Sequence, residues 1–159
     1  MIEIYCDGSC CGNPGVGGFG VIVIQDFKIL NAYSGSSEET TNNRMELEAL
    51  IKALDFAITD YKDELVKIYS DSAYCVNIFN SWIYNWYRNN WKNSSKKTVE
   101  NLDLVKKLWL FKQIDIPNFS VEKIKGHSGI IGNELADAAA TKNSKKFEKI
   151  FLENHLVYE

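Results

Sequence analysis

The sequence contains no apolar run that approaches the roughly 18 residues needed by a membrane-spanning helix. It begins with the strand-like MIEIYC, so the charged and apolar regions of a signal peptide are also missing. Internal repeats, low-complexity tracts and linkers are absent from its 159 residues. We therefore expect a single globular domain in the cytoplasm, without contact to a membrane.

Cysteine is sparse and its spacing is unlike that of a zinc site. None of the four cysteines belongs to a C-x-x-C pair, and Cys10 and Cys11 are adjacent. This arrangement suits neither a zinc knuckle nor a disulfide framework, so reduced thiols are expected. The 45% hydrophobic content is sufficient for one good core, which has to supply the stability.

Positive charge is scarce in the chain as a whole, which carries a formal net charge of -3. Taken alone, this balance argues against a nucleic-acid partner. The basic residues are concentrated, however, because residues 82–112 hold seven of them against two acidic ones, a local balance of +5. A basic patch on an acidic body is expected when one element binds a polyanion and another holds cations.

A glycine-rich stretch follows the first strand-like segment. Gly15, Gly17 and Gly20 match G-x-G-x-x-G, the spacing of a dinucleotide-binding loop. Such a loop has to open a helix, whereas the residues that follow are FGVIVIQ, which indicates a strand. The pattern therefore favours glycines in a tight turn that leads into a hairpin strand.

The order of the periodic patterns predicts an α/β fold. Five segments read as strands, and the first three are expected to be antiparallel: 2–7, 19–25, 29–34, 65–71 and 119–125. Four segments read as helices: the stretch from Thr41 to Ile58, a short helix after Ser72, 99–112 and 134–142. We predict a mixed five-stranded sheet flanked by helices.

Two further segments complete the expected architecture. Residues 82–97 are rich in aromatic and basic side chains and are predicted to form a basic helical protrusion. The main domain is expected to span residues 1–143. In the tail, 144–159, apolar residues recur at helical spacing, so we expect a helix that packs on the domain.

Four carboxylates lie where such groups can act as ligands. Asp7 and Asp71 end two predicted strands, and ligands gather at the carboxyl ends of strands in α/β sheets. Glu46 is expected in the first turn of the long helix, at the edge of its buried face. Asp137 lies among apolar and small residues in the last helix, where an ionised group needs a partner or a cation.

Each acid has a simpler explanation when it is taken alone. Asp7 could open a turn, Asp71 could cap a helix, and Glu46 could be favoured by the helix dipole. Taken together, four converging carboxylates with no matching Lys or Arg nearby would repel one another strongly. Oxygen ligands on separate elements are what Mg²⁺ requires at a phosphoryl-transfer site, so the set predicts metal binding.

Five motifs, in this order, resemble type 1 ribonuclease H of the bacterial kind: DGSCCGNPGVGG, TTNNRMELEAL, YSDSAY, the segment from WIYNW to KKTVENLDL, and KGHSGIIGNELADAAA. The resemblance covers roughly residues 1–142. It implies a ribonuclease H-like fold and an endonuclease that cuts the RNA strand of RNA–DNA hybrids, leaving 5′-phosphate and 3′-hydroxyl ends. By position, Asp7, Glu46, Asp71 and Asp137 would hold two Mg²⁺ ions in the presence of substrate, and Mn²⁺ could substitute.

The resemblance also assigns further residues. His127, in the loop GHSG, would assist proton transfer or the release of product and metal, although by itself it reads as an exposed loop histidine. The residues that would contact the hybrid, largely independently of its sequence, are Cys10, Asn13, Thr41, Asn42, Asn43, Trp82, Trp86, Lys92, Lys96 and Lys97. Because tryptophans also pack between short helices, at least one of Trp82, Trp86 and Trp91 is expected to be mainly core. Arg44 is left out of the site, since it can pair with an acid such as Asp103.

Two other functions remain open on the same fold. A non-catalytic nucleic-acid-binding module would gain nothing from carboxylates that repel phosphate. A related nuclease or transposase that acts on DNA would share the acids. The loops that carry Asn13, Asn42 and Asn43, which would contact a hybrid across its minor groove, and the basic protrusion favour the hybrid instead. We expect a stand-alone enzyme that works as a monomer, with no obligatory protein partner.

Overall fold

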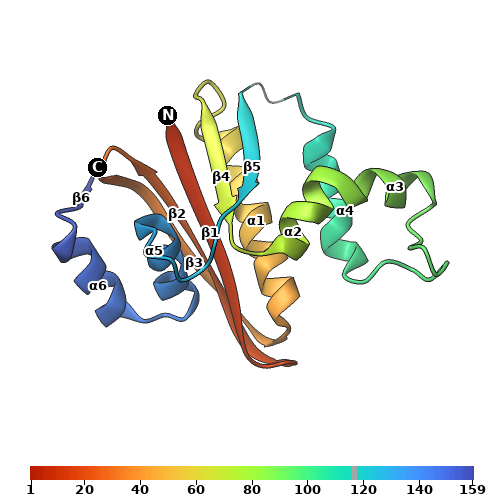
Figure 1. Cartoon of the computed structure of the whole chain (residues 1–159), viewed down its shortest axis with the longest axis horizontal. Helices are drawn as coiled ribbons and strands as arrows, with labels where there is room; N and C mark the ends of the chain where they lie inside the picture. The colour runs from red at the N-terminus through yellow and green to blue at the C-terminus, as the bar shows by residue number, and fades with distance from the viewer. Residues whose placement is uncertain (116–117) are drawn as a thin grey trace.

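The structure is a computed structural model that describes residues 1–115 and 118–159, and it contains one sheet with helices on both faces (Figure 1). The strands are β1 (Ile2–Gly12), β2 (Gly15–Gln25), β3 (Lys28–Thr40), β4 (Val66–Ser70), β5 (Phe119–Lys123) and β6 (Val157–Tyr158). Their order in the sheet is β5-β4-β1-β2-β3-β6. The first three strands are antiparallel, and β4, β5 and β6 each run parallel to a neighbour. The predicted mixed α/β sheet is therefore confirmed.

The sequence predicted five strands, but the sheet formed by the described residues has six. The sixth strand, β6, has only two residues and pairs with Lys28 and Ile29 at the start of β3. A two-residue strand is too short to show an alternation of apolar and polar residues, so the sequence gives no sign of it.

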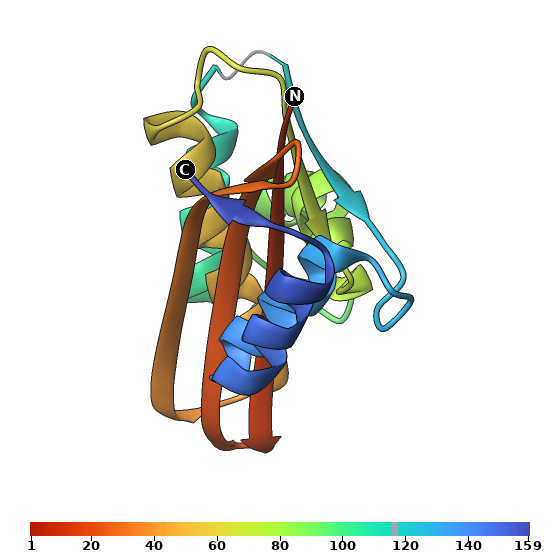
Figure 2. The ribbon, with the colours of Figure 1, turned by 90° about the vertical axis from the view of Figure 1, so that its left-hand side faces the viewer.

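The described residues contain seven helical segments besides the sheet: α1 (Asn42–Thr59), α2 (Ala73–Asn77), the π-helical turn η1 (Ile78–Trp82), α3 (Ile83–Arg88), α4 (Leu102–Lys112), α5 (Ile131–Ala140) and α6 (Ser144–Glu153). The protrusion, which consists of α3 and the loop between α3 and α4, extends away from the sheet (Figure 1). The tail forms α6 and β6, and α6 lies against α5 on the opposite face of the sheet from α1 (Figure 2).

Two cores lie on the two faces of the sheet. Ile4 and Cys6 of β1 belong to the larger core beneath α1, whereas Tyr5 between them belongs to the smaller core beneath α5. Because side chains alternate along a strand, a strand covered on both faces reads as a nearly continuous apolar run. Phe147 and Ile150 of α6 pack against the smaller core.

The glycine-rich stretch forms a strand ladder. β1 and β2 pair residue for residue from Glu3 with Ile24 to Gly12 with Gly15, and the turn itself is formed by Asn13 and Pro14. The interpretation of Gly17 and Gly20 as turn residues is therefore wrong. Gly20 faces α5, where a Cβ atom would lie 2.5 Å from the carbonyl oxygen of Ala136. The bare backbone of β2 thus allows the close approach of the helix that carries Asp137.

Replacement of this glycine is expected to destabilise the fold. Gly20→Ala should lower the free energy of unfolding by about 1–3 kcal/mol, because α5 has to move away from β2. Chemical denaturation followed by circular dichroism measures the change. Ala32→Val, which adds bulk at an exposed position of β3, is the control and should change stability by less than about 0.5 kcal/mol. A Gly20→Ala variant as stable as the wild type would contradict this account of the packing.

Candidate active site

Parallel pairing of β1 with β4 brings two of the predicted acids together. Cys6 pairs with Ser70, so Asp7 and Asp71 are the next residues along the two neighbouring strands. Asp7 still belongs to β1 and is only 6% exposed, while Asp71 directly follows β4 and is half-buried. The two side chains lie at the carboxyl end of β4, the edge at which ligands gather in α/β sheets.

The start of α1 supplies the third acid. Thr41 is the N-cap, and its Oγ1 accepts a hydrogen bond from the Arg44 N–H at 3.2 Å. Since α1 begins at Asn42, Glu46 opens its second turn, and the placement of Glu46 in the first turn is wrong. The backbone N–H of Gly8 donates a hydrogen bond to the Glu46 carboxyl, which ties the helix to the end of β1.

Asp7, Glu46 and Asp71 form a compact set of oxygen ligands. One carboxyl oxygen of each lies within 4.8 Å of the other two. Burial, and then the negative charge of Asp71, raise the pKa of Asp7 to about 8. Burial, followed by the charges of Asp7 and Asp71, raises the pKa of Glu46 well above its ordinary value, and the carboxyls of Asp7 and Glu46 share a hydrogen bond that needs a proton. Three hard oxygen ligands whose charges are uncompensated fit a divalent cation.

The fourth acid, Asp137, has a partner that the sequence did not reveal. It lies near enough to Asp7 to raise the pKa of that residue, but it is outside the set of three. Its Oδ2 is 2.6 Å from Nζ of Lys146, which also lies 3.1 Å from Oε2 of Glu134. The expectation that no Lys or Arg matches the acids is therefore wrong at Asp137. The contact arises because α6 folds back on α5, and the only signal in the sequence is Asn143, which caps α6.

His127 lies in the loop between β5 and α5. Its side chain is exposed and its backbone has a φ of 52°. The preceding residue, Gly126, packs against Asp71, where a Cβ atom would lie 2.7 Å from Oδ2. The loop that carries His127 is thus in contact with Asp71 of the acidic set.

Five of the predicted substrate contacts share one surface beside Glu46. The Asn42 N–H donates to Oδ1 of Asn13 at 3.1 Å, which joins the β1–β2 turn to the start of α1. Asn13, Asn42 and Asn43 are exposed. Cys10 is half-buried, and its thiol donates to the backbone carbonyl of Thr40, next to Thr41.

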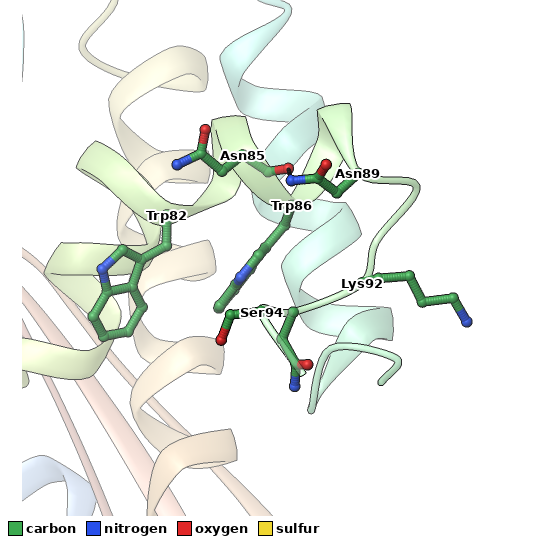
Figure 3. Close-up of a pocket in the computed structure, with 7 residues that line it drawn as sticks. Trp82, Asn85, Trp86, Asn89, Lys92 and Ser94 are labelled. Carbon is green, nitrogen blue, oxygen red and sulfur yellow. Dashed lines mark hydrogen bonds between the residues drawn. The ribbon is translucent and has the colours of Figure 1, made fainter. Parts of the chain in front are cut away.

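The other predicted contacts lie on the protrusion. A groove of about 470 Å³ is lined by Trp82, Asn85, Trp86, Asn89, Lys92, Asn93 and Ser94 (Figure 3). Of these residues, the sequence predicted only Trp82, Trp86 and Lys92 as substrate contacts, because asparagine and serine in a loop form no distinctive pattern. Lys92 points away from the tryptophans in Figure 3. Lys96 and Lys97 are exposed on the loop that follows.

The aromatic side chains of the protrusion divide into two groups. Trp91 packs edge-on against Tyr87 and Trp109, and these contacts join the protrusion to α4. Trp82 is 41% exposed, while Trp86 is half-buried. Trp91 therefore has the packing role expected of at least one of these tryptophans, whereas Trp82 and Trp86 line the groove.

Arg44 pairs with Asp103, as the sequence suggested. Its guanidinium donates to both carboxylate oxygens, at 3.0 and 2.7 Å, and lowers the pKa of Asp103 to about 2. The pair joins the start of α1 to α4, the helix on which the protrusion rests.

Comparison with known proteins agrees with this geometry. The sequence model of the RNase H family matches residues 1–145. The chain belongs to the ribonuclease H family. It is 44% identical over 147 residues to a ribonuclease H of Chlorobium chlorochromatii, covering 92% of this chain and 97% of that protein. It is 43% identical over 149 residues to ribonuclease HI of Haemophilus influenzae, covering 91% and 90%.

Solved structures of ribonucleases H share the fold. LC11-RNase H1, determined in complex with an RNA/DNA hybrid, superposes with a TM-score of 0.66 at 29% identity and covers 92% of this chain and 98% of that one. The PFV RNase H domain gives a TM-score of 0.76 at 24% identity, covering 91% and 94%. The predicted resemblance to type 1 ribonuclease H and the predicted enzyme class, a nuclease, are confirmed. Among the described residues of this ribonuclease H, no helix has the length and apolar character required to cross a membrane.

Proposed function

We propose that this ribonuclease H cleaves the RNA strand of RNA–DNA hybrids endonucleolytically, using two Mg²⁺ ions and leaving 5′-phosphate and 3′-hydroxyl ends. The observation that carries the proposal is the convergence of Asp7, Glu46 and Asp71 within 4.8 Å of one another. It occurs where β4 ends beside the parallel strand β1, in a chain that matches the RNase H family over residues 1–145.

The four acids divide the work of holding metal. Asp7, Glu46 and Asp71 supply oxygens from β1, α1 and the end of β4, and Asp137 supplies a fourth from α5. When bound, the ions activate the attacking water and stabilise the departing 3′-oxygen. The proton shared by Asp7 and Glu46 has to leave first, because carboxylates bind metal in their ionised form. His127, at the rim, would then transfer a proton or assist release of the product.

Two surfaces would hold the hybrid. Asn13, Asn42 and Asn43 present amides beside the acids and can reach across a minor groove, where 2′-hydroxyls distinguish RNA from DNA. The groove of Trp82 and Trp86 and the lysines of the protrusion would follow the DNA strand. LC11-RNase H1, which shares the fold, was solved with such a duplex, and this supports the hybrid as the substrate. Contacts to sugar and phosphate carry no sequence information, so cleavage should depend little on the nucleotide sequence. All the proposed ligands and contacts come from one chain, so the enzyme should work as a monomer.

Removal of the charges of the protrusion should weaken binding. Replacement of Lys92, Lys96 and Lys97 by Gln is expected to reduce hybrid affinity about tenfold at low salt. The slope of log affinity against log salt should fall by about two, because fewer counterions are released. Fluorescence anisotropy with labelled hybrid over a salt series measures both. Removal of the same number of charges at Lys28, Lys62 and Lys149, which lie off the protrusion, is the control. An equal effect in the two triple variants would contradict a specific role for the protrusion.

The proposed function is tested by cleavage of end-labelled duplexes. RNA–DNA hybrid should be cut in Mg²⁺, whereas double-stranded RNA and double-stranded DNA should stay intact. The products should carry 5′-phosphate and 3′-hydroxyl ends, so a ligase should rejoin them, and removal of the 5′-phosphate should prevent this. EDTA should stop the cleavage. An equal rate on double-stranded DNA would instead point to a nuclease that acts on DNA, and cleavage that persists in EDTA would exclude the metal mechanism.

A further inference from the structure

Lys146 brings a cation from the tail into the acidic site. Its Nζ lies 2.6 Å from Oδ2 of Asp137 and 3.1 Å from Oε2 of Glu134. The match to the RNase H family ends at residue 145, one residue before this lysine. Lys146 is therefore a residue of α6 that contacts a predicted metal ligand from outside the matched region.

The contact is more enclosed than an ordinary surface ion pair. The side chains of Lys146, Glu134 and Asp137 are 30%, 22% and 20% exposed. For comparison, Lys149 and Glu153, on the same helix, are 73% and 63% exposed and lie 3.9 Å apart. Although burial alone would lower the pKa of Lys146, its contacts to Asp137 and Glu134 outweigh burial and raise the pKa, so the ammonium stays charged.

The position of Lys146 is also well defined by the fold. Asn143 ends the turn after α5 and caps α6, because its Oδ1 accepts a hydrogen bond from the Lys146 N–H at 3.1 Å. Phe147, the next residue, packs against the smaller core. These contacts fix the backbone of Lys146, so that its side chain starts from a defined position beside Asp137.

We propose that Lys146 is a positioning residue that holds Asp137 in the metal-free enzyme and opposes a divalent cation there, so that it sets the metal concentration at which the site fills. An ammonium and a metal ion that share one carboxylate repel each other, and this repulsion is strong at a partly enclosed site. The inference rests on the proposed function in one respect, namely that Asp137 is a metal ligand.

Binding of Mn²⁺ alone to the full chain, measured by isothermal titration calorimetry at fixed ionic strength, tests the proposal. Lys146→Met keeps an unbranched side chain that is one atom shorter and removes its charge, so it should bind Mn²⁺ about threefold to tenfold more tightly than the wild type. Lys146→Arg keeps the charge and should stay within about twofold of the wild type. Lys149→Met removes the same charge from the exposed face of α6 and should leave the affinity unchanged.

The possible outcomes separate the inference from the proposed function. If Lys146→Met binds Mn²⁺ no more tightly than Lys149→Met, the opposing role is wrong, whatever its melting temperature. If the wild type binds no Mn²⁺ at all, the metal mechanism and this inference both fail. Lys146→Gln provides a second uncharged variant if Lys146→Met does not fold, and circular dichroism in EDTA establishes which variants are folded.

Discussion

Asp7→Asn is expected to reduce cleavage of RNA–DNA hybrid by about a thousandfold or more and to raise the melting temperature of the metal-free protein. The two effects have one cause. Asp7 is the most buried of the three converging acids, and it lies next to Asp71 and Glu46. The amide removes a ligand from the centre of the site, and it is neutral without having to bind a proton, which the buried Asp7 carboxyl must do beside its acidic neighbours.

Single-turnover cleavage in Mg²⁺ and thermal unfolding in EDTA measure the two effects. Asp63→Asn makes the same chemical change at an exposed position between α1 and β4, and it should alter neither. Hybrid cleavage by Asp7→Asn at more than about a tenth of the wild-type rate would remove Asp7 from the metal site. A lower melting temperature of Asp7→Asn than of the wild type in EDTA would show that the Asp7 carboxyl stabilises the metal-free fold, which would contradict the prediction.

The second large effect is a loss of metal-free stability as the pH rises. Asp7 has a pKa of about 8 in the folded protein, against about 4 for an ordinary aspartate, so the folded state holds its proton more tightly than the unfolded state does. The resulting stabilisation is fully present below pH 4 and is lost as the pH rises through 8. The free energy of unfolding in EDTA should therefore fall by on the order of 3 kcal/mol between pH 5 and pH 9.

Urea denaturation at several pH values, in EDTA and in saturating Mg²⁺, measures this dependence. Mg²⁺ replaces the bound proton, so its stabilising effect should increase with pH and should offset the loss. Asp7→Asn should reduce the slope of the profile in EDTA without abolishing it, because burial still raises the pKa of Glu46, whereas Asp63→Asn should keep the wild-type slope. Metal-free stability that rises between pH 5 and pH 9 would contradict the raised pKa of Asp7.

The parts of the molecule that could be predicted from its sequence are those governed by local patterns. Apolar periodicity predicted the type and order of the long elements, and the helices expected from Thr41 and after Ser72 are present, with these two residues as N-caps. Asp7 and Asp71 could be expected in one site because ligands gather at the carboxyl ends of strands, although the first strand continues beyond Asp7 to Gly12. These inferences need only the neighbouring residues and the rules by which strands and helices connect.

What could not be predicted depends on contacts between distant segments. Gly20 has no side chain and so allows α5 to pack closely on β2, but no residue near Gly20 in the sequence indicates which helix will lie there. The contact of Lys146 with Asp137 depends on the direction in which the tail turns after Asn143. The two residues of β6 pair with β3, and Tyr158 stacks on Phe151 of α6. In each case the decisive partner is set by tertiary packing and leaves no local pattern.

The short strand β6 has a consequence for how the molecule behaves in a crowded solution. The outer edge of β3 offers unpaired backbone groups, and such edges invite strands of other molecules and start aggregation. β6 covers this edge beside Ile29, where the strand is apolar. Farther along, β3 continues as SGSSEET, in which Glu38 and Glu39 place like charges that repel a second copy. The C-terminal residues thus cover the apolar start of this strand edge, while the charges of Glu38 and Glu39 protect its far end.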